Sequence, residues 1–147
     1  MIGFNHALTG GLLALTLPAP IALPLAFVSH FVLDMLPHYG IKNSERDKSN
    51  FWKVFFTIDA FATLGLAIYA ITNRPEITIF LGGLFATMPD YIWVARVIRT
   101  RSFDLSKNGY RFTKWHARIQ GYERPWGIWI EIPVAVVLFY VVFGVLW

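Results

Sequence analysis

The residues best suited to chemistry lie in the run from Ser29 to His38, which closes a long apolar stretch. His30, Asp34 and His38 are spaced there at i, i+4 and i+8, so a helix places them on one face at steps of about 6 Å. Pro37 is expected to end or bend that helix and to leave His38 at the end of the helix. Two imidazoles and a carboxylate in hydrocarbon cost several kcal/mol unless they pair with each other, a metal ion or water. The spacing therefore predicts a polar site in apolar surroundings.

Other ionisable residues are predicted to reach the same depth from other parts of the chain. Asp59, Asp90 and Glu131 each lie six or seven residues from the nearest Lys or Arg, in apolar stretches. At 1.5 Å per residue, this depth is roughly 6 to 12 Å below the membrane surface. His6 enters the membrane from the same side, and His116, in a basic loop, can fold onto it. These groups are scattered in the sequence, but we expect them to share one layer.

Imidazole and carboxylate side chains are ready ligands for a divalent metal ion, and the chain has no cysteine to supply thiolate ligands or a thiol nucleophile. We therefore expect one or two divalent ions, with zinc or manganese favoured. A position left open for water would provide a hydroxide source near neutral pH. The candidate ligands are His6, His30, Asp34, His38, Asp59, Asp90 and His116.

Structural interpretations of the same residues stay open. A histidine inside a membrane can form a hydrogen bond to a neighbouring helix, and Asp59 can cap the backbone of another helix. Asp90 can satisfy the backbone that Pro89 interrupts, and Glu131 can be an interfacial residue. For His30, Asp34 and His38, three such groups on one buried face, a purely structural role is harder to justify.

The composition is that of an integral membrane protein. Of the 147 residues, 56% are hydrophobic and only 15% are charged, and the apolar residues form long runs. No basic segment precedes the first run, so a cleaved signal peptide is not expected. We predict an all-α, polytopic helical bundle of four or five spans in a single transmembrane domain, residues 1–147. Its parts are a hairpin at about 6–36 (helices 6–17 and 21–36), a hairpin at about 51–97 (spans 51–71 and 77–97), a basic loop at 98–125 and a last span at 126–147.

The distribution of Lys and Arg predicts the orientation. Twelve of the 13 lie around two connections, near residues 42–53 and 96–124. The positive-inside rule makes both connections cytoplasmic, which places the N-terminus in the cytoplasm and the C-terminus outside a bacterial-type inner membrane. At a membrane boundary, such a basic and aromatic-rich loop favours anionic lipid headgroups over nucleic acid as its partner.

A weak internal similarity relates the two hairpins. Residues 6–15 resemble residues 59–68, and residues 35–39 resemble residues 87–91. Either the hairpins are duplicated copies, or the match arises by chance because apolar stretches match easily. Duplication would place a site between two parallel hairpins.

Several of these motifs together resemble a known family. An early histidine before small residues (6–10), the run at 29–38, Met-Pro-Asp at 88–90 and a late loop histidine are similar to the small bacterial inner-membrane proteins named membrane-bound metal-dependent hydrolases. The similarity covers about residues 5–38, more loosely 85–91 and 115–120, and the family has a similar size and span number. It implies a hydrolase whose substrate is not fixed.

Carried over residue by residue, the resemblance supports one set of ligands more than others. The best supported are His6, His30, Asp34 and Asp90, followed by His38 and His116. Family members commonly show a Pro-Asp-x-Asp-His run, which is absent here, where Leu-Pro-His and Met-Pro-Asp-Tyr stand instead. The number of metal ions therefore stays open.

The function that these observations favour is metal-dependent hydrolysis of an ester or phosphoester, in a lipid or lipid-linked substrate, at the cytoplasmic face. Glu131 is the expected proton-transfer residue, and Arg118 and Arg124 are expected to contact a phosphate. No nucleophile elbow, Walker loop, His-Glu-x-x-His or dinucleotide motif offers another chemistry. Two alternatives stay open: a small metal-ion or proton transporter, which at this size would need to form a homo-oligomer, and a structural or regulatory protein with a polar packing layer.

Overall fold

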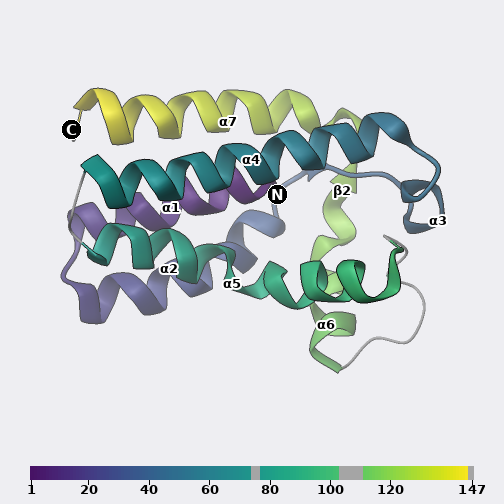
Figure 1. Cartoon of the computed structure of the whole chain (residues 1–147), viewed down its shortest axis with the longest axis horizontal. Coiled ribbons are helices and arrows are strands. Elements are labelled where there is room, and N and C mark those ends of the chain that lie inside the picture. The colour runs from purple at the N-terminus through teal and green to yellow at the C-terminus, as the bar shows by residue number, and fades with distance from the viewer. Residues whose placement is uncertain (74–76, 103–110, 146–147) are drawn as a thin grey trace.

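The computed structural model describes residues 1–73, 77–102 and 111–145 and shows a helical bundle with a small cap at one end (Figure 1). The all-α prediction is confirmed, and each of the five predicted helices begins within three residues of its expected start. The bundle helices are α1 (Gly3–Thr16), α2 (Ala19–Asp34), α4 (Asn50–Asn73), α5 (Ile77–Thr100) and α7 (Ile128–Tyr140), the last extended by the π-helical turn η3 (Val141–Val145). The cap elements are β1 (His38–Tyr39), α3 (Asn43–Arg46), α6 (Arg111–Ile119), the short 3-10 helices η1 (Gln120–Tyr122) and η2 (Pro125–Gly127), and β2 (Glu123–Arg124).

Three segments of the described chain are long and apolar enough to cross a membrane: α4, α5 and Pro125–Gly144. With 14 and 16 residues, α1 and α2 are about 21 and 24 Å long, short of the roughly 30 Å hydrocarbon core. Large apolar side chains are exposed on the outer helices, including Phe61 at 69% and Val136 at 62%. Such surfaces suit lipid better than water. The structure is thus compatible with a membrane protein, and the count of four or five spans stays a prediction.

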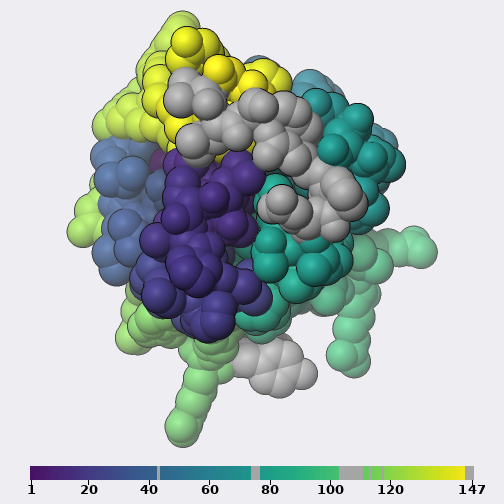
Figure 2. Space-filling view, turned by 90° about the vertical axis from the view of Figure 1, so that its left-hand side faces the viewer, coloured from purple at the N-terminus to yellow at the C-terminus, as the bar shows by residue number. Residues whose placement is uncertain are grey.

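The short helix α1 lies at the centre of the bundle, in contact with α2, α4, α5 and α7. No residue from Met1 to Leu15 is exposed, and Figure 2 shows the purple N-terminal segment between the yellow and teal helices. Small residues permit this close packing. A Cβ atom added to Gly10 would lie 2.1 Å from the carbonyl oxygen of Gly82 in α5. Backbone approach through small residues is a common way for membrane helices to associate.

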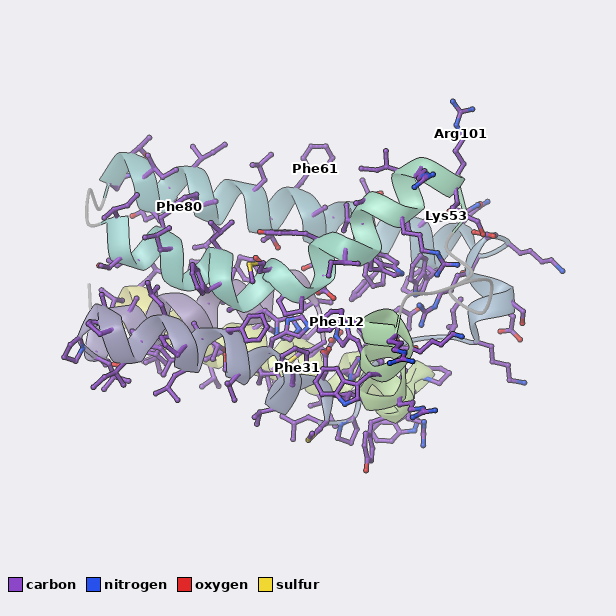
Figure 3. The ribbon with its side chains drawn as sticks, turned by 90° about the horizontal axis from the view of Figure 1, so that it is seen from below. Phe31, Lys53, Phe61, Phe80, Arg101 and Phe112 are labelled. Carbon is purple, nitrogen blue, oxygen red and sulfur yellow. The ribbon has the colours of Figure 1, made fainter. Side chains whose placement is uncertain are left out.

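In the described parts of the basic segment, 98–102 and 111–125, the structure is more helical than the loop that we predict from the sequence. α5 continues to Thr100, and α6 then packs against α2. The rings of Phe112 and Trp115 lie 6.4 and 4.9 Å from that of Phe31, and Figure 3 shows Phe31 and Phe112 together beneath α5. The density of Lys and Arg in this segment obscured its amphipathic helical pattern.

Buried polar contacts join the two basic connections at the cap end. β1 pairs in parallel with β2, with His38 opposite Glu123. Arg46, only 4% exposed, donates to the carboxylate of Glu123 and to the carbonyl of Ile41, and its guanidinium lies 5.2 Å from the ring centroid of Trp52. Burial raises the pKa of Glu123 above its ordinary value, although Arg46 opposes the shift. Both connections therefore lie at the same end of the bundle, as expected from the charge distribution.

Asp59 of α4 caps the start of α1. Its two carboxylate oxygens accept the backbone N–H groups of Gly3 and Phe4, each at 2.9 Å. A helix leaves these N–H groups without an intrahelical partner. In Asp59→Asn, only one side-chain oxygen can accept, so we expect a loss of about 1 kcal/mol in the free energy of unfolding. Thermal unfolding in detergent measures this loss, and the content of any bound divalent metal should equal that of the original chain. Loss of metal from a stably folded Asp59→Asn would instead identify Asp59 as a ligand.

Candidate metal centre

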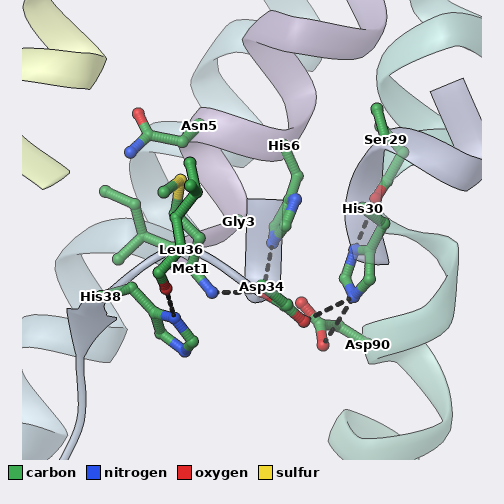
Figure 4. A network of polar contacts seen from close by, with 12 residues as sticks. Met1, Gly3, Asn5, His6, Ser29, His30, Asp34, Leu36, His38 and Asp90 are labelled. Atoms are coloured by element: carbon green, nitrogen blue, oxygen red, sulfur yellow. Dashed lines mark hydrogen bonds and ion pairs between the residues drawn. The ribbon is translucent and has the colours of Figure 1, made fainter. Parts of the chain in front are cut away.

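Four helices bring side chains of the metal-ligand type to one point near the cap end of the bundle. α1 provides His6, α2 provides His30 and Asp34, α5 provides Asp90 and α6 provides His116 (Figure 4 shows the first four). All are buried except Asp90, whose side chain is 25% exposed. The structure therefore shows the convergence of these five side chains that the layer of ionisable groups predicts.

Asp34 is the hub of the cluster. Its Oδ2 lies 2.9 Å from Nε2 of His116 and 3.2 Å from Nε2 of His30. Its Oδ1 lies 3.2 Å from Nε2 of His6 and also accepts a hydrogen bond from the α-ammonium group of Met1. Each oxygen of one carboxylate is thus shared by at least two cationic or potentially cationic groups.

His30 is held in the orientation of a metal ligand. Its Nδ1–H donates to the carbonyl of Ala86 at 2.7 Å, which directs Nε2 into the cluster. Pro89 interrupts the hydrogen-bond ladder of α5 nearby, and the helix changes direction along its length in Figure 1. The missing N–H of Pro89 leaves the carbonyl of Phe85 without its helical donor. In the same turn, the carbonyl of Ala86 accepts from His30. Nε2 then lies 3.0 Å from Nε2 of His116 and 3.7 Å from Oδ1 of Asp90. A carbonyl on the second nitrogen is the usual support for a ligating histidine.

His6 is the group whose polar atoms are least satisfied. It is fully buried, and its ring stacks on that of His30 with 4.0 Å between centroids. Within the described residues neither ring nitrogen has a hydrogen-bond partner, because the approach of Nε2 to Asp34 lacks hydrogen-bond geometry. An unsatisfied buried polar group costs about 1–3 kcal/mol. A metal ion bound at Nε2 would satisfy that nitrogen and remove its share of this cost.

The donor geometry fits a divalent metal ion. His6, His30 and Asp90 form one group whose ligand atoms lie within 4.8 Å of one another, and His30, Asp34 and His116 form a second. Ligand atoms that share an ion at about 2.0–2.2 Å lie at most roughly 4.4 Å apart, so small shifts would close either group on an ion. Nitrogen and oxygen donors of this kind suit zinc, manganese or iron.

Aromatic rings surround one side of the cluster. The ring of Phe31 lies 5.3 Å from that of His30 and 5.6 Å from that of His116, and Phe112 and Trp115 of α6 pack beside it. His116 thus reaches the cluster from the segment between α5 and α7, as predicted. An apolar shell of this kind limits water access and keeps the local dielectric constant low.

Two predicted ligands lie outside both groups in the described part of the chain. Both oxygens of Asp59 accept backbone N–H groups of α1. Nδ1 of His38 donates to the carbonyl of Leu36 at 2.7 Å, and burial lowers the pKa of His38 to about 4, so its ring is neutral at pH 7. His38 does not share the helical face of His30 and Asp34, because α2 ends at Asp34 and His38 lies outside the helix. Neither residue therefore belongs to the two groups that could share an ion.

The residues predicted to act on the substrate have contacts of their own. Glu131 of α7 is fully buried; its Oε1 accepts the N–H of Ile2 at 2.8 Å, and its main-chain carbonyl accepts Nδ2 of Asn5. Its Oε2 has no hydrogen-bond partner among the described residues. Arg118 and Arg124 are exposed, and Arg124 donates to two main-chain carbonyls nearby. Their roles toward a substrate stay predictions.

Three supporting residues were not anticipated from the sequence. Buried Asn5 joins α1 to α7, and its position beside His6 in an apolar stretch was an available signal. The role of the Ala86 carbonyl as an acceptor for a side chain was indicated only indirectly, by the nearby Pro89 in the same helix. Arg46 had no signal, because a single arginine in a polar connection gives no sign of burial.

Comparison with known proteins adds no further constraint. No protein-family model matches the sequence, and neither a curated protein nor a solved structure matches the chain. The function therefore has to be inferred from the geometry of the cluster and its surroundings.

Proposed function

We propose that this chain is a membrane-embedded, metal-dependent hydrolase of an ester or phosphoester in a lipid or lipid-linked substrate. The observation that carries this proposal is the convergence of three imidazoles and two carboxylates from four helices on one point. If the polar layer served only to specify helix packing, isolated pairs of hydrogen-bonded side chains would be enough. Here five groups crowd together, and the nitrogens of His6 lack hydrogen-bond partners in the described part of the chain.

Each member of the cluster has a role in this proposal. His6, His30, Asp34, Asp90 and His116 would hold zinc or manganese. When bound, such an ion polarises a carbonyl or phosphoryl oxygen and lowers the pKa of bound water toward 7. The main-chain contact of His30 fixes its ring, and the aromatic shell excludes bulk water. Asp90, the one partly exposed member, marks the side from which a substrate approaches.

The rest of the bundle favours a one-sided site over a transport pathway. Residues 7–29, 60–73, 77–89 and 132–147 contain no Asp, Glu, Lys, Arg or His. From Ala7 to Thr16, α1 alone extends about 14 Å beyond the cluster without an ionisable group. Ion and proton relays through membranes normally use ionisable side chains along their path. The cluster is therefore better suited to chemistry at one membrane face.

The proposed location is a bacterial-type inner membrane with the cap in the cytoplasm. The cap end carries the two basic connections, which contact each other through Arg46 and Glu123. Exposed cations on α6, namely Arg111, Lys114 and Arg118, suit the headgroups of anionic lipids. A substrate that resides in the bilayer can reach the cluster from this face.

The test combines metal analysis with hydrolysis by the full chain in detergent. We expect purified protein to bind zinc or manganese stoichiometrically, and to hydrolyse 4-nitrophenyl phosphate esters or 4-nitrophenyl acyl esters only when that metal is restored after chelation. His30→Gln should lose both properties. His38→Gln is the matched control and should keep both, because His38 lies outside the cluster.

Two results would contradict the proposal. Folded protein without stoichiometric metal, and without hydrolysis of either probe, would favour the packing role. Metal-dependent ion flux in liposomes, without hydrolysis, would favour the transporter.

A further inference from the structure

His116 reaches the candidate metal centre from a short helix in the cap. α6 packs against α2 through the ring of Phe31, which contacts the rings of Phe112, Trp115 and His116. Apolar contacts are non-directional, so they bring α6 to α2 without fixing how it slides or turns there. Nε2 of His116 nevertheless lies 2.9 Å from Oδ2 of Asp34, a distance that requires a fixed position of α6.

The segment that follows α6 is joined to the segment that follows α2 by directional contacts. β2 pairs with β1, and the N–H of Gly40 donates to the carbonyl of Arg124 at 3.3 Å. The two segments lie so close that a Cβ atom at Gly40 would be 2.6 Å from Cβ of Glu123. A Cβ atom at Gly127 would be 2.0 Å from the carbonyl carbon of His38. The chain just beyond α6 is therefore held against the chain just beyond α2.

A buried ion pair reinforces this junction. Arg46, only 4% exposed, donates to the carboxylate of Glu123 and, at 3.2 Å, to the carbonyl of Ile41. Its guanidinium lies 5.2 Å from the ring centroid of Trp52, so the pair also connects β2 to α4. A buried charge that loses its partner is strongly destabilising. The pair therefore favours the one placement of β2 in which Glu123 meets Arg46.

We infer that the buried pair of Arg46 and Glu123 positions His116 for metal binding. Glu123 follows His116 by seven residues, which extend roughly 12 Å through the end of α6 and the 3-10 helix η1. Because both helical segments have internal hydrogen bonds, fixing β2 fixes where α6 ends and which way His116 faces. The inference rests on the proposed function, since it makes Arg46 and Glu123 positioning residues of a metal ligand.

The first experiment measures the accessibility of two histidines in the full chain, in detergent and after treatment with EDTA. Diethyl pyrocarbonate modifies accessible imidazoles, and mass spectrometry reports the modification rate at each histidine. We expect Arg46→Met to raise the rate at His116 at least tenfold. The rate at His30 should stay unchanged, because α2 and the carbonyl of Ala86 hold that ring independently of α6.

Matched variants keep this result interpretable. Lys48→Met removes an exposed cation from the same connection and should leave both rates as in the original chain. If Arg46→Met fails to fold, Glu123→Gln, which keeps the length of the side chain, should expose His116 in the same way. An unchanged rate at His116 would overturn the inference. An equal rise at His30 would overturn it too, because the bundle would then have loosened as a whole.

The second experiment measures zinc affinity in a double-mutant cycle. Arg46→Met should weaken zinc binding roughly tenfold, as loss of an outer-shell partner does, but less than about twofold when His116→Gln is already present. An equal loss in both backgrounds would overturn a role through His116. A chain that binds no zinc, yet exposes His116 selectively in Arg46→Met, would overturn the hydrolase and keep the positioning pair. A chain that binds zinc equally with and without Arg46→Met would overturn the positioning pair and keep the hydrolase.

Discussion

Asp34→Asn should lower the affinity of the purified protein for the divalent metal that we propose for the cluster by more than about 100-fold, beyond the roughly 10- to 100-fold typical of losing an outer-shell partner. The reason is geometric. Both oxygens of Asp34 face imidazole nitrogens at 2.9–3.2 Å, so one carboxylate neutralises charge for His6, His30 and His116 together. An amide keeps the shape but supplies no negative charge, and its NH₂ group would point at a histidine.

The matched control for this prediction is Asp59→Asn, which removes a charge of equal size from another helix of the bundle, α4. Asp59 holds only backbone N–H groups, so that variant should keep its metal. Inductively coupled plasma mass spectrometry after gel filtration measures bound metal, and a titration in a metal buffer measures affinity. Equal metal affinity in Asp34→Asn and the original chain would end the assignment of Asp34 as the hub.

Gly10→Leu should destabilise the bundle by at least about 3 kcal/mol, the upper end of what overpacking costs, and should also remove the metal site. The first added atom already clashes with α5: Cβ would lie 2.1 Å from the carbonyl oxygen of Gly82 and 2.7 Å from Cβ of Ala86. Backbone atoms cannot rotate away as a side chain can, so α1 and α5 must separate. Ala86, whose carbonyl orients His30, would move with α5.

Gly65→Leu is the matched control for this prediction. On the exposed side of α4, where a Cβ meets nothing within 4 Å, it should be neutral or stabilising by up to about 1 kcal/mol, because glycine is costly inside a helix. Thermal unfolding followed by circular dichroism, together with the yield of monodisperse protein, separates the two variants. A melting temperature for Gly10→Leu within a few degrees of the original chain would contradict the close packing of α1 on α5.

The sequence alone determined which groups had to find partners. Ionisable residues in hydrocarbon are costly wherever the helices lie, so the apolar runs around His6, His30, Asp34 and Asp90 were enough to predict that they meet. The same runs predicted the bundle helices, because each is apolar over a length that only a helix can satisfy in a membrane. The periodicity of α6 was present in the sequence as well, but its charges led to the prediction of a loop.

Which partner each group meets was decided only by the tertiary structure. Asp59 and Asp34 are both carboxylates in apolar helices, yet one caps α1 and the other joins three histidines. His38 keeps its place in the i, i+4, i+8 series, yet α2 ends at Asp34 before that series is complete. The free-energy cost of burying a group depends on its residue type and on its apolar surroundings, and both can be read from the sequence. Pairing depends on distances of a few ångströms between helices, and these are set by contacts such as Gly10 on Gly82, where the absence of a side chain lets two backbones meet.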